Sequence, residues 1–329
     1  MLNESDGRRS EQSDRKVLVV TSGRSDASPL KHVIEHLGKN AEVHNIGGGP
    51  RMSVDRAMQA IQISRPDIMV LLGDRFESMG AAYAATYRQT PIAHIHGGEH
   101  TLGSMDNAFR HAISKMSHIH LVANYQAKDT LVRMGEENIY ITGAPGLDAV
   151  QEIIDEGLRK PEKYFVVTLH PDTLGGDSGV NSLIKALKQF PDYGVYWTSP
   201  NGDPGRNEIM RAFRVIEFRF GDWTHEEYLR KCRHAACVIG NSSSGIIEAP
   251  YLEVPTVNIG ERQDGRQMAN SIITADIDAD TIKTAIKMAL SDSSWNPGGI
   301  YGHAGASKRI AEIIAGHDLN NILRKSWLG

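Results

Sequence analysis

The chain has 329 residues, of which 40% are hydrophobic and 23% are charged, and its formal net charge is −4. A chain of this size folds as one large domain or, more often, as two. The small negative charge excludes a global attraction to nucleic acid or to an anionic membrane. We therefore expect no nucleic-acid partner and no membrane partner, but a small-molecule ligand held by local groups.

The first 16 residues are polar and charged and contain no apolar stretch, which predicts a tail and neither a signal peptide nor a membrane anchor. No later run is long and apolar enough to span a bilayer. Cys232 and Cys237 are the only cysteines, and their spacing fits neither a zinc site nor a disulfide framework. We therefore expect two packing residues in a protein of the reducing cytoplasm.

From Lys16 onward, short runs of β-branched residues alternate with longer segments of helical pattern, which is typical of an α/β fold with parallel sheets. The runs form two series, separated near residues 150–162 by a connector rich in turn-forming and charged residues. The first series of predicted strands lies within residues 16–23, 66–74, 90–98, 118–124 and 138–145. The second lies within residues 163–170, 194–200, 215–220, 235–245 and 255–260.

Two series of strands predict two Rossmann-like domains that face each other across a cleft. We expect a polar tail over residues 1–16, an N-terminal domain over 17–157 and a C-terminal domain over 158–302. A C-terminal helix within 303–329 is expected to pack back on the N-terminal domain. In doubly wound sheets the ligand binds at the carboxyl ends of the strands, so functional residues are expected in the loops that follow them.

Polar residues directly follow four of the predicted strands. They are Gly73-Asp74-Arg75, Gly97-Gly98-Glu99, His170, and the run from Asn241 to Gly245. Because the carboxyl ends of parallel strands meet at one edge of a sheet, this placement predicts a single active cleft. Carboxylates that converge with arginines and histidines are typical of an acid/base site.

The stretch HIHGGEHTLGSMD, residues 94–106, allows two interpretations. One is a site for zinc or another transition metal. The other is acid/base chemistry on a polar substrate. The potential metal ligands are His94, His96, Glu99, His100 and Asp106.

The stretch GNSSSGIIEAP, residues 240–250, is predicted to join a strand to a helix through small residues. Backbone N–H groups at such a helix start can bind a diphosphate, and the serine hydroxyls can add donors. An ordinary N-cap run has the same composition. The stretch is not a P-loop, because it lacks the required lysine.

Two other loops contain arginines at predicted strand ends. Arg262 and Arg266 in NIGERQDGRQ can grip a phosphate or a carboxylate, or else belong to a solvated surface loop. Arg24 and Ser28 lie where a helix starts after the first strand, which predicts a position at the cleft. The alternative there is a plain helix start capped by Asp26 or Ser28.

Seven stretches of the chain together resemble the hydrolysing UDP-N-acetylglucosamine 2-epimerases of the sialic-acid and legionaminic-acid type. They are LLGDRFES, AHIHGGEHTLGSMDNAFRHAISKMSHIH, ITGAPGLD, TLHPDT, SPNGDPG, VIGNSSSGIIEAP and VNIGERQDGRQ, and the resemblance runs from about Val17 to Ile313. It implies a two-domain, glycosyltransferase-B-like fold that needs no cofactor, neither metal nor nicotinamide, and that forms a homodimer or homotetramer.

The reaction implied by the resemblance converts a UDP-2-acetamido sugar and water to the free 2-epimer and UDP, through elimination to a glycal and rehydration. UDP-GlcNAc, giving ManNAc, is the default substrate. Non-hydrolysing relatives have an apolar residue at the position of Glu99. The glutamate in this chain therefore favours the hydrolysing reaction. The alternatives are the same reaction on UDP-2,4-diacetamido-2,4,6-trideoxyglucose, non-hydrolysing 2-epimerisation, and a non-catalytic nucleotide-sugar binding module.

The same resemblance implies roles for individual residues. Asp74, Glu99 and Asp106 become the acid/base carboxylates, without a choice of which one removes the C2 proton. The substrate-binding residues it implies are Arg24, Ser28, Arg75, His170, Asn201, Ser242, Ser243, Ser244, Gly245, Glu248 and Arg262. The chain is shorter than the family usually is around residues 44–60, on the sugar side of the cleft, which leaves the choice of sugar open.

Overall fold

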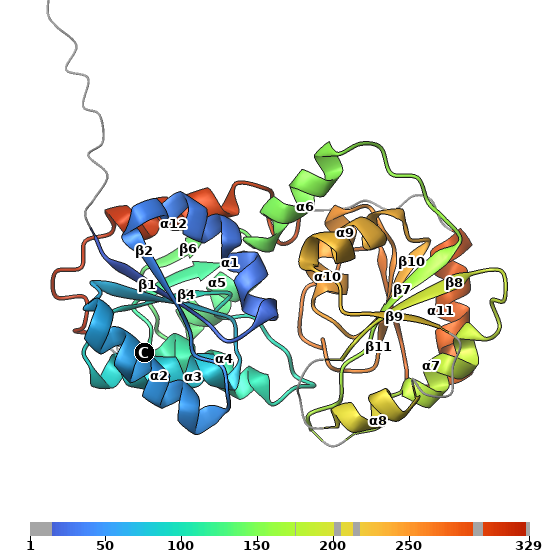
Figure 1. The fold of residues 1–329 in the computed structure, drawn as a ribbon, viewed down its shortest axis with the longest axis horizontal. Coiled ribbons are helices and arrows are strands. Elements are labelled where there is room, and N and C mark those ends of the chain that lie inside the picture. Colours follow the sequence, from blue (N-terminus) through green and yellow to red (C-terminus); the bar gives the residue numbers. More distant parts are fainter. Residues whose placement is uncertain (1–14, 175, 201–204, 213–217, 292–298, 327–329) are drawn as a thin grey trace, which may run out of the picture.

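The computed structural model describes residues 15–174, 176–200, 205–212, 218–291 and 299–326. Within these residues the chain forms two α/β domains, each built on a parallel sheet of six strands (Figure 1). The prediction of two Rossmann-like domains is confirmed. Among the described residues, no helix is both long enough and apolar enough to cross a membrane.

The N-terminal sheet has the strand order β2-β1-β3-β4-β5-β6, so the order reverses between β1 and β3. Its strands are β1 (Val17–Thr21), β2 (Ala41–Asn45), β3 (Ile68–Leu72), β4 (Ile92–Ile95), β5 (Ile119–Val122) and β6 (Ile139–Ile141). The helices of this half are α1 (Arg24–Leu37), η1 (Gly38–Asn40), α2 (Pro50–Ser64), α3 (Phe76–Tyr87), α4 (Asp106–Met116), α5 (Tyr125–Arg133) and α6 (Gly146–Asp155).

The C-terminal sheet has the order β12-β11-β10-β7-β8-β9, which is the order of a dinucleotide-binding Rossmann sheet and reverses between β7 and β10. Its strands are β7 (Tyr164–Thr168), β8 (Gly194–Thr198), β9 (Arg219–Gly221), β10 (Cys237–Gly240), β11 (Thr256–Ile259) and β12 (Ile272–Ala275). The helices in this half of the chain are α7 (Val180–Leu187), α8 (Arg206–Ala212), α9 (His225–His234), α10 (Ser244–Tyr251), α11 (Ala279–Ser291) and α12 (Ala306–Gly316).

Helices cover both faces of each sheet, which is why the central strands read as continuous apolar runs. Val17 and Val19 of β1 belong to the core beneath α1 and α12, whereas Leu18 and Val20 belong to the core beneath α2 and α3. The strands β1, β3, β4, β5, β10 and β11 are buried along their whole length.

Two strands were not predicted, and both lie at the edge of a sheet. In β2 the central residues Glu42 and Val43 are exposed, and in β12 only Ala275 is buried. An edge strand such as β2, with most of its residues in solvent, needs no apolar run, so composition gives little signal for it. Of the run predicted over 215–220, the described part belongs to or adjoins β9.

The segment predicted as a connector near residues 150–162 is helical as far as Asp155. The apolar residues of α6, among them Leu147, Val150 and Ile153, join the core that also contains β7, α9 and α10. In the opposite direction, Ile310 and Ile314 of α12 join the core of the N-terminal sheet. The chain therefore crosses between the two domains twice, and Figure 1 shows α12 beside α1.

Candidate active site

The polar residues predicted at strand ends lie where the parallel strands end. Asp74 follows β3, Glu99 follows β4 in the N-terminal sheet, and His170 follows β7 in the C-terminal sheet. Asn241 follows β10 and joins it to β7, because its amide accepts from His170 N at 2.7 Å and donates to His170 O at 2.9 Å. The two reversal points, β1/β3 and β7/β10, are where this kind of sheet binds ligands.

The loop after β4 and the loop after β11 bring the two domains into direct contact. Leu102 N donates to Asp264 O at 2.9 Å, and next to these loops Gln126 Nε2 of α5 donates to Gly265 O at 3.1 Å. Gly103 lies so close to the second loop that a Cβ atom there would be 2.2 Å from Glu261 O. Only glycine permits this approach, so the carboxyl edges of the two sheets meet at these loops.

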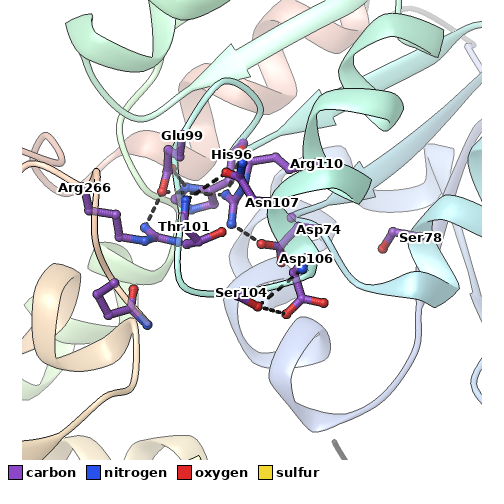
Figure 2. A network of polar contacts seen from close by, with 12 residues as sticks. Asp74, Ser78, His96, Glu99, Thr101, Ser104, Asp106, Asn107, Arg110 and Arg266 are labelled. Carbon is purple, nitrogen blue, oxygen red and sulfur yellow. Dashed lines mark hydrogen bonds and ion pairs between the residues drawn. The ribbon is translucent and has the colours of Figure 1, made fainter. Parts of the chain in front are cut away.

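Glu99 is the most enclosed of the three predicted carboxylates, with a side chain that is 3% exposed. Its Oε1 lies 2.5 Å from His96 Nδ1, and its Oε2 pairs with Arg266 of the other domain (Figure 2). Burial by itself would raise the pKa of Glu99, but the charges of Arg266, His96 and Arg110 outweigh it and hold that pKa well below its usual range. Glu99 is therefore an ionised group that links the domains.

Asp74 is held by an arginine that the sequence did not suggest. Arg110, which is buried in α4, pairs with Asp74 through Nη2 and donates from Nη1 to His96 O at 3.0 Å. Its signal in the sequence is the spacing of four from Asp106, which places both residues on one face of a helix. Arg75, the arginine beside Asp74 in the chain, pairs with Glu77 at 3.1 Å.

Asp106 is the first residue of α4 and is partly exposed. Its Oδ2 accepts from Ser104 Oγ at 2.9 Å, and Arg262 Nη2 of the other domain lies 3.8 Å away. Thr173 belongs to the segment after β7 and accepts from Met105 N at 3.1 Å. The structure thus brings Asp106 and Arg262 together, which the sequence did not predict as a pair.

The five potential metal ligands of residues 94–106 make separate contacts, apart from His96 and Glu99, which contact each other. His94 is buried between Gly73 O at 2.7 Å and Ser114 Oγ at 3.2 Å, and burial lowers its pKa to about 3. His100 Nε2 lies 3.1 Å from Thr130 Oγ1, while His96 and Asp106 have the partners given above. Within the described ranges, no three histidine, cysteine, aspartate or glutamate side chains are grouped so as to hold a metal ion.

The serine-rich loop starts α10, with Ser243 at the N-cap position. Its side chain makes no capping hydrogen bond. Ser242 Oγ accepts weakly from Ser244 N at 3.3 Å, and Ser244 Oγ donates to Tyr228 OH at 3.0 Å. Gly245 packs on β11, where a Cβ atom would be 3.0 Å from Thr256 Cγ2. The loop therefore lies at the β7/β10 reversal point.

Of the remaining predicted residues, those that the structure describes belong to α1 and α10. Arg24 and Ser28 are in the first two turns of α1, whose N-cap is Gly23 and not Asp26 or Ser28, so the predicted cap is wrong. The Asp26 carboxylate turns back and accepts from Ser22 N at 2.9 Å. Glu248 Oε1 lies 2.8 Å from His225 Nε2. Asn201 lies outside the described residues.

The chain is similar in sequence to UDP-sugar 2-epimerases. Residues 40–315 match the family model described as UDP-N-acetylglucosamine 2-epimerase. Over 275 residues the chain is 32% identical to a UDP-N,N'-diacetylbacillosamine 2-epimerase (hydrolyzing) of Legionella pneumophila, covering 78% of this chain and 72% of that protein. Over 280 residues it is 32% identical to a UDP-N-acetylglucosamine 2-epimerase of Neisseria meningitidis serogroup B, covering 78% and 73%.

The fold is also similar to solved structures of UDP-GlcNAc 2-epimerases. The UDP-GlcNAc 2-epimerase of Methanocaldococcus jannaschii, solved in complex with UDP-GlcNAc and UDP, superposes with a TM-score of 0.77 at 15% identity, over 91% of this chain and 99% of that one. The Neisseria meningitidis UDP-GlcNAc 2-epimerase bound to UDP-GlcNAc gives 0.74 at 17% identity, over 91% and 99%. At these identities the likeness concerns the fold, which is glycosyltransferase-B-like as predicted.

Proposed function

The chain belongs to the UDP-N-acetylglucosamine 2-epimerase family, and we propose that it is a hydrolysing member. It would convert a UDP-2-acetamido sugar and water to the free 2-epimeric sugar and UDP. The observation that carries this proposal is the gathering of Asp74, Glu99 and Asp106 with arginines from both domains. No metal or nicotinamide cofactor enters the proposal.

The chemistry requires leaving-group stabilisation first. The sugar C2–H is too weak an acid for direct removal, so departure of UDP from C1 must build the positive charge that acidifies it. Arg262 and the N–H groups at the start of α10 would stabilise the departing diphosphate. A base then removes the C2 proton to give a glycal, and water adds with the opposite configuration at C2.

We propose that Asp106 removes the C2 proton. The side chains of Asp74 and Asp106 are partly exposed, whereas that of Glu99 is enclosed and its pKa is held low, which makes Glu99 a weak base. Asp74, fixed by Arg110, would supply the second acid/base group. Glu99, which lies between the domains, would be the third carboxylate of the site. The sugar would bind on the side of residues 17–157 and UDP on the side of residues 158–302.

The UDP-sugar would contact residues that the family resemblance implies, on its nucleotide or its sugar side. They are Arg24, Ser28, Arg75, His170, Asn201, Ser242, Ser243, Ser244, Gly245, Glu248 and Arg262. Of these, Arg75 pairs with Glu77 in the structure. UDP-GlcNAc is the default substrate because one 32% identical relative is named for it. The UDP-diacetamido-trideoxy sugar is the second candidate substrate, because another relative of 32% identity is named for UDP-N,N'-diacetylbacillosamine.

The proposed function is tested by supplying each UDP-sugar separately and measuring free UDP and free sugar by chromatography. We expect stoichiometric release of UDP and a free 2-epimer from at least one of them. Interconversion of UDP-sugars without free UDP would contradict hydrolysis and favour the non-hydrolysing reaction. A thermal shift with UDP but turnover of neither sugar would contradict catalysis and favour a binding module.

Replacing Ser243 or Arg262 by alanine is expected to raise the Kd for UDP about tenfold or more, since each change removes a hydrogen bond to a charged diphosphate worth about 1.5–3 kcal/mol. Isothermal titration calorimetry measures this directly. Ser291→Ala is the matched control, because that serine lies at the exposed end of α11 and donates to Met288 O of the same helix. A Kd unchanged in both variants would remove α10 from the UDP site.

We also propose that the protein is a homodimer or homotetramer. The helix α3 is apolar on nearly all sides, and a helix of that kind is normally covered all round. On α2 and α3 the structure leaves Met52, Ile63, Tyr83 and Tyr87 exposed. Tyr87→Asp is expected to shift the mass measured by light scattering toward that of one chain, whereas Tyr125→Asp on α5 should not. An oligomer that survives Tyr87→Asp unchanged would place the interface elsewhere.

A further inference from the structure

Glu248 has a histidine partner on the neighbouring helix. His225 is the first residue of α9, and its Nε2 lies 2.8 Å from Glu248 Oε1 in α10. Both side chains are largely buried, at 18% and 11% exposed. A buried carboxylate is costly unless it is paired and hydrogen-bonded. His225 supplies that partner to Glu248.

The start of α9 determines where His225 lies. Thr224 and Glu227 form a capping box, in which Thr224 Oγ1 accepts from Glu227 N at 3.2 Å and Thr224 N donates to Glu227 Oε2 at 2.8 Å. The box holds the first turn of α9 in one conformation. The imidazole of His225 is therefore presented to Glu248 by a rigid helix end.

The pair lies beside the proposed nucleotide site. Glu248 is one turn beyond Ser244 in α10, and a Cβ atom on Gly146 of α6 would be 3.2 Å from Glu248 Oε1. Burial alone would lower the pKa of His225, but the charge of Glu248 and the hydrogen bond to it outweigh burial and raise it. For Glu248, burial is outweighed in the same way and its pKa is lowered. Both directions favour a charged pair.

We propose that His225 is a positioning residue for nucleotide recognition, which holds the Glu248 carboxylate so that it accepts hydrogen bonds from the ribose hydroxyls of UDP. This inference rests on the proposed function, in which Glu248 binds the ribose. His225 contacts no reacting atom in this scheme. Its loss weakens UDP binding and ribose discrimination and leaves the chemical step unchanged.

The test compares UDP with 2′-deoxy-UDP by calorimetry and measures kcat and KM in parallel. For His225→Leu we expect an about tenfold weaker affinity for UDP and a smaller preference for UDP over the deoxy form. KM rises and kcat stays within about twofold. His225→Gln keeps a donor and is expected to restore both affinity and preference, and Glu248→Gln is expected to lose the preference. His234→Leu, at the far end of α9 beside Lys160, is the matched control and should match the native protein.

An unchanged preference for UDP in His225→Leu would overturn the inference, as would a fall in kcat with KM unchanged, or a His225→Gln variant as impaired as His225→Leu. If His225→Leu does not fold, His225→Asn serves instead, because its short amide stays polar but does not reach Glu248, and the same loss of preference is expected. Absence of UDP binding by the native protein would overturn the proposed function and, with it, this role. If the native protein binds UDP but substitution of His225 changes neither the affinity nor the preference, only the role of His225 is overturned and the proposed function stands.

Discussion

Replacing Asp106 by asparagine is expected to lower kcat by at least about 100-fold, the contribution typical of general acid/base catalysis, while the Kd for UDP stays within a few-fold of the native value. Asparagine keeps the size of the side chain and can still accept from Ser104 Oγ, which lies 2.9 Å from Asp106 Oδ2. It cannot take up a proton. Steady-state kinetics with the preferred UDP-sugar and calorimetry with UDP separate the two effects.

Asp280→Asn is the matched control for Asp106→Asn. Asp280 also lies in the first turn of a helix, α11, and it is exposed, so its loss of charge should change neither quantity. Native turnover by Asp106→Asn would remove Asp106 from the acid/base chemistry. A large rise in the Kd for UDP with unchanged kcat would assign Asp106 to binding instead.

Glu99→Gln is expected to have two effects. The first is a loss of kcat of at least about 100-fold, because a neutral amide no longer stabilises the positive charge that departure of UDP would build at C1. The second is a loss of stability of the closed arrangement of the domains, since the change leaves Arg266 buried opposite a neutral amide. Breaking a buried ion pair by removing one partner costs about 3–5 kcal/mol. We therefore expect a lower melting temperature or, in small-angle scattering, a larger radius of gyration.

A double-mutant cycle separates these two effects. Arg266→Met in the Glu99→Gln background removes the unpaired buried charge, so it is expected to restore part of the stability but none of the activity. The exposed pair of Glu156 and Arg230 provides the matched control, since an ion pair in solvent contributes little to stability. Equal melting temperatures and scattering curves for native protein and Glu99→Gln would contradict the linking role of Glu99.

The sequence predicted those parts of the fold that depend on local pattern. The buried central strands are apolar throughout, as IMVLL in β3 shows, and such runs between turns identify a parallel sheet. The edge strand β2 was missed because its exposed residues carry no such pattern, and β12 was missed because its apolar run, IITA, is only four residues long. The helical start of the connector was missed because the charged residues in this stretch indicated a turn. The helical spacing of its apolar residues Leu147, Val150 and Ile153 was overlooked.

The candidate site was predictable where a motif follows a strand, as for Asp74, Glu99 and His170. Its pairings were not, because they join residues far apart in the chain. Glu99 and Arg266 are separated by 167 positions, and nothing in either motif indicates that they meet. Arg110 was missed because an arginine on an amphipathic helix normally faces solvent, whereas this one is buried beside two carboxylates.

The most direct test of the proposed reaction is turnover in D2O. The protein is incubated with UDP-GlcNAc, or with the diacetamido-trideoxy sugar nucleotide, and the products are examined by NMR and mass spectrometry. Elimination to a glycal followed by rehydration predicts free UDP together with a free 2-epimeric sugar that carries one deuterium at C2. Release of UDP with hydrogen retained at C2 would contradict the elimination mechanism and the role given to the carboxylates.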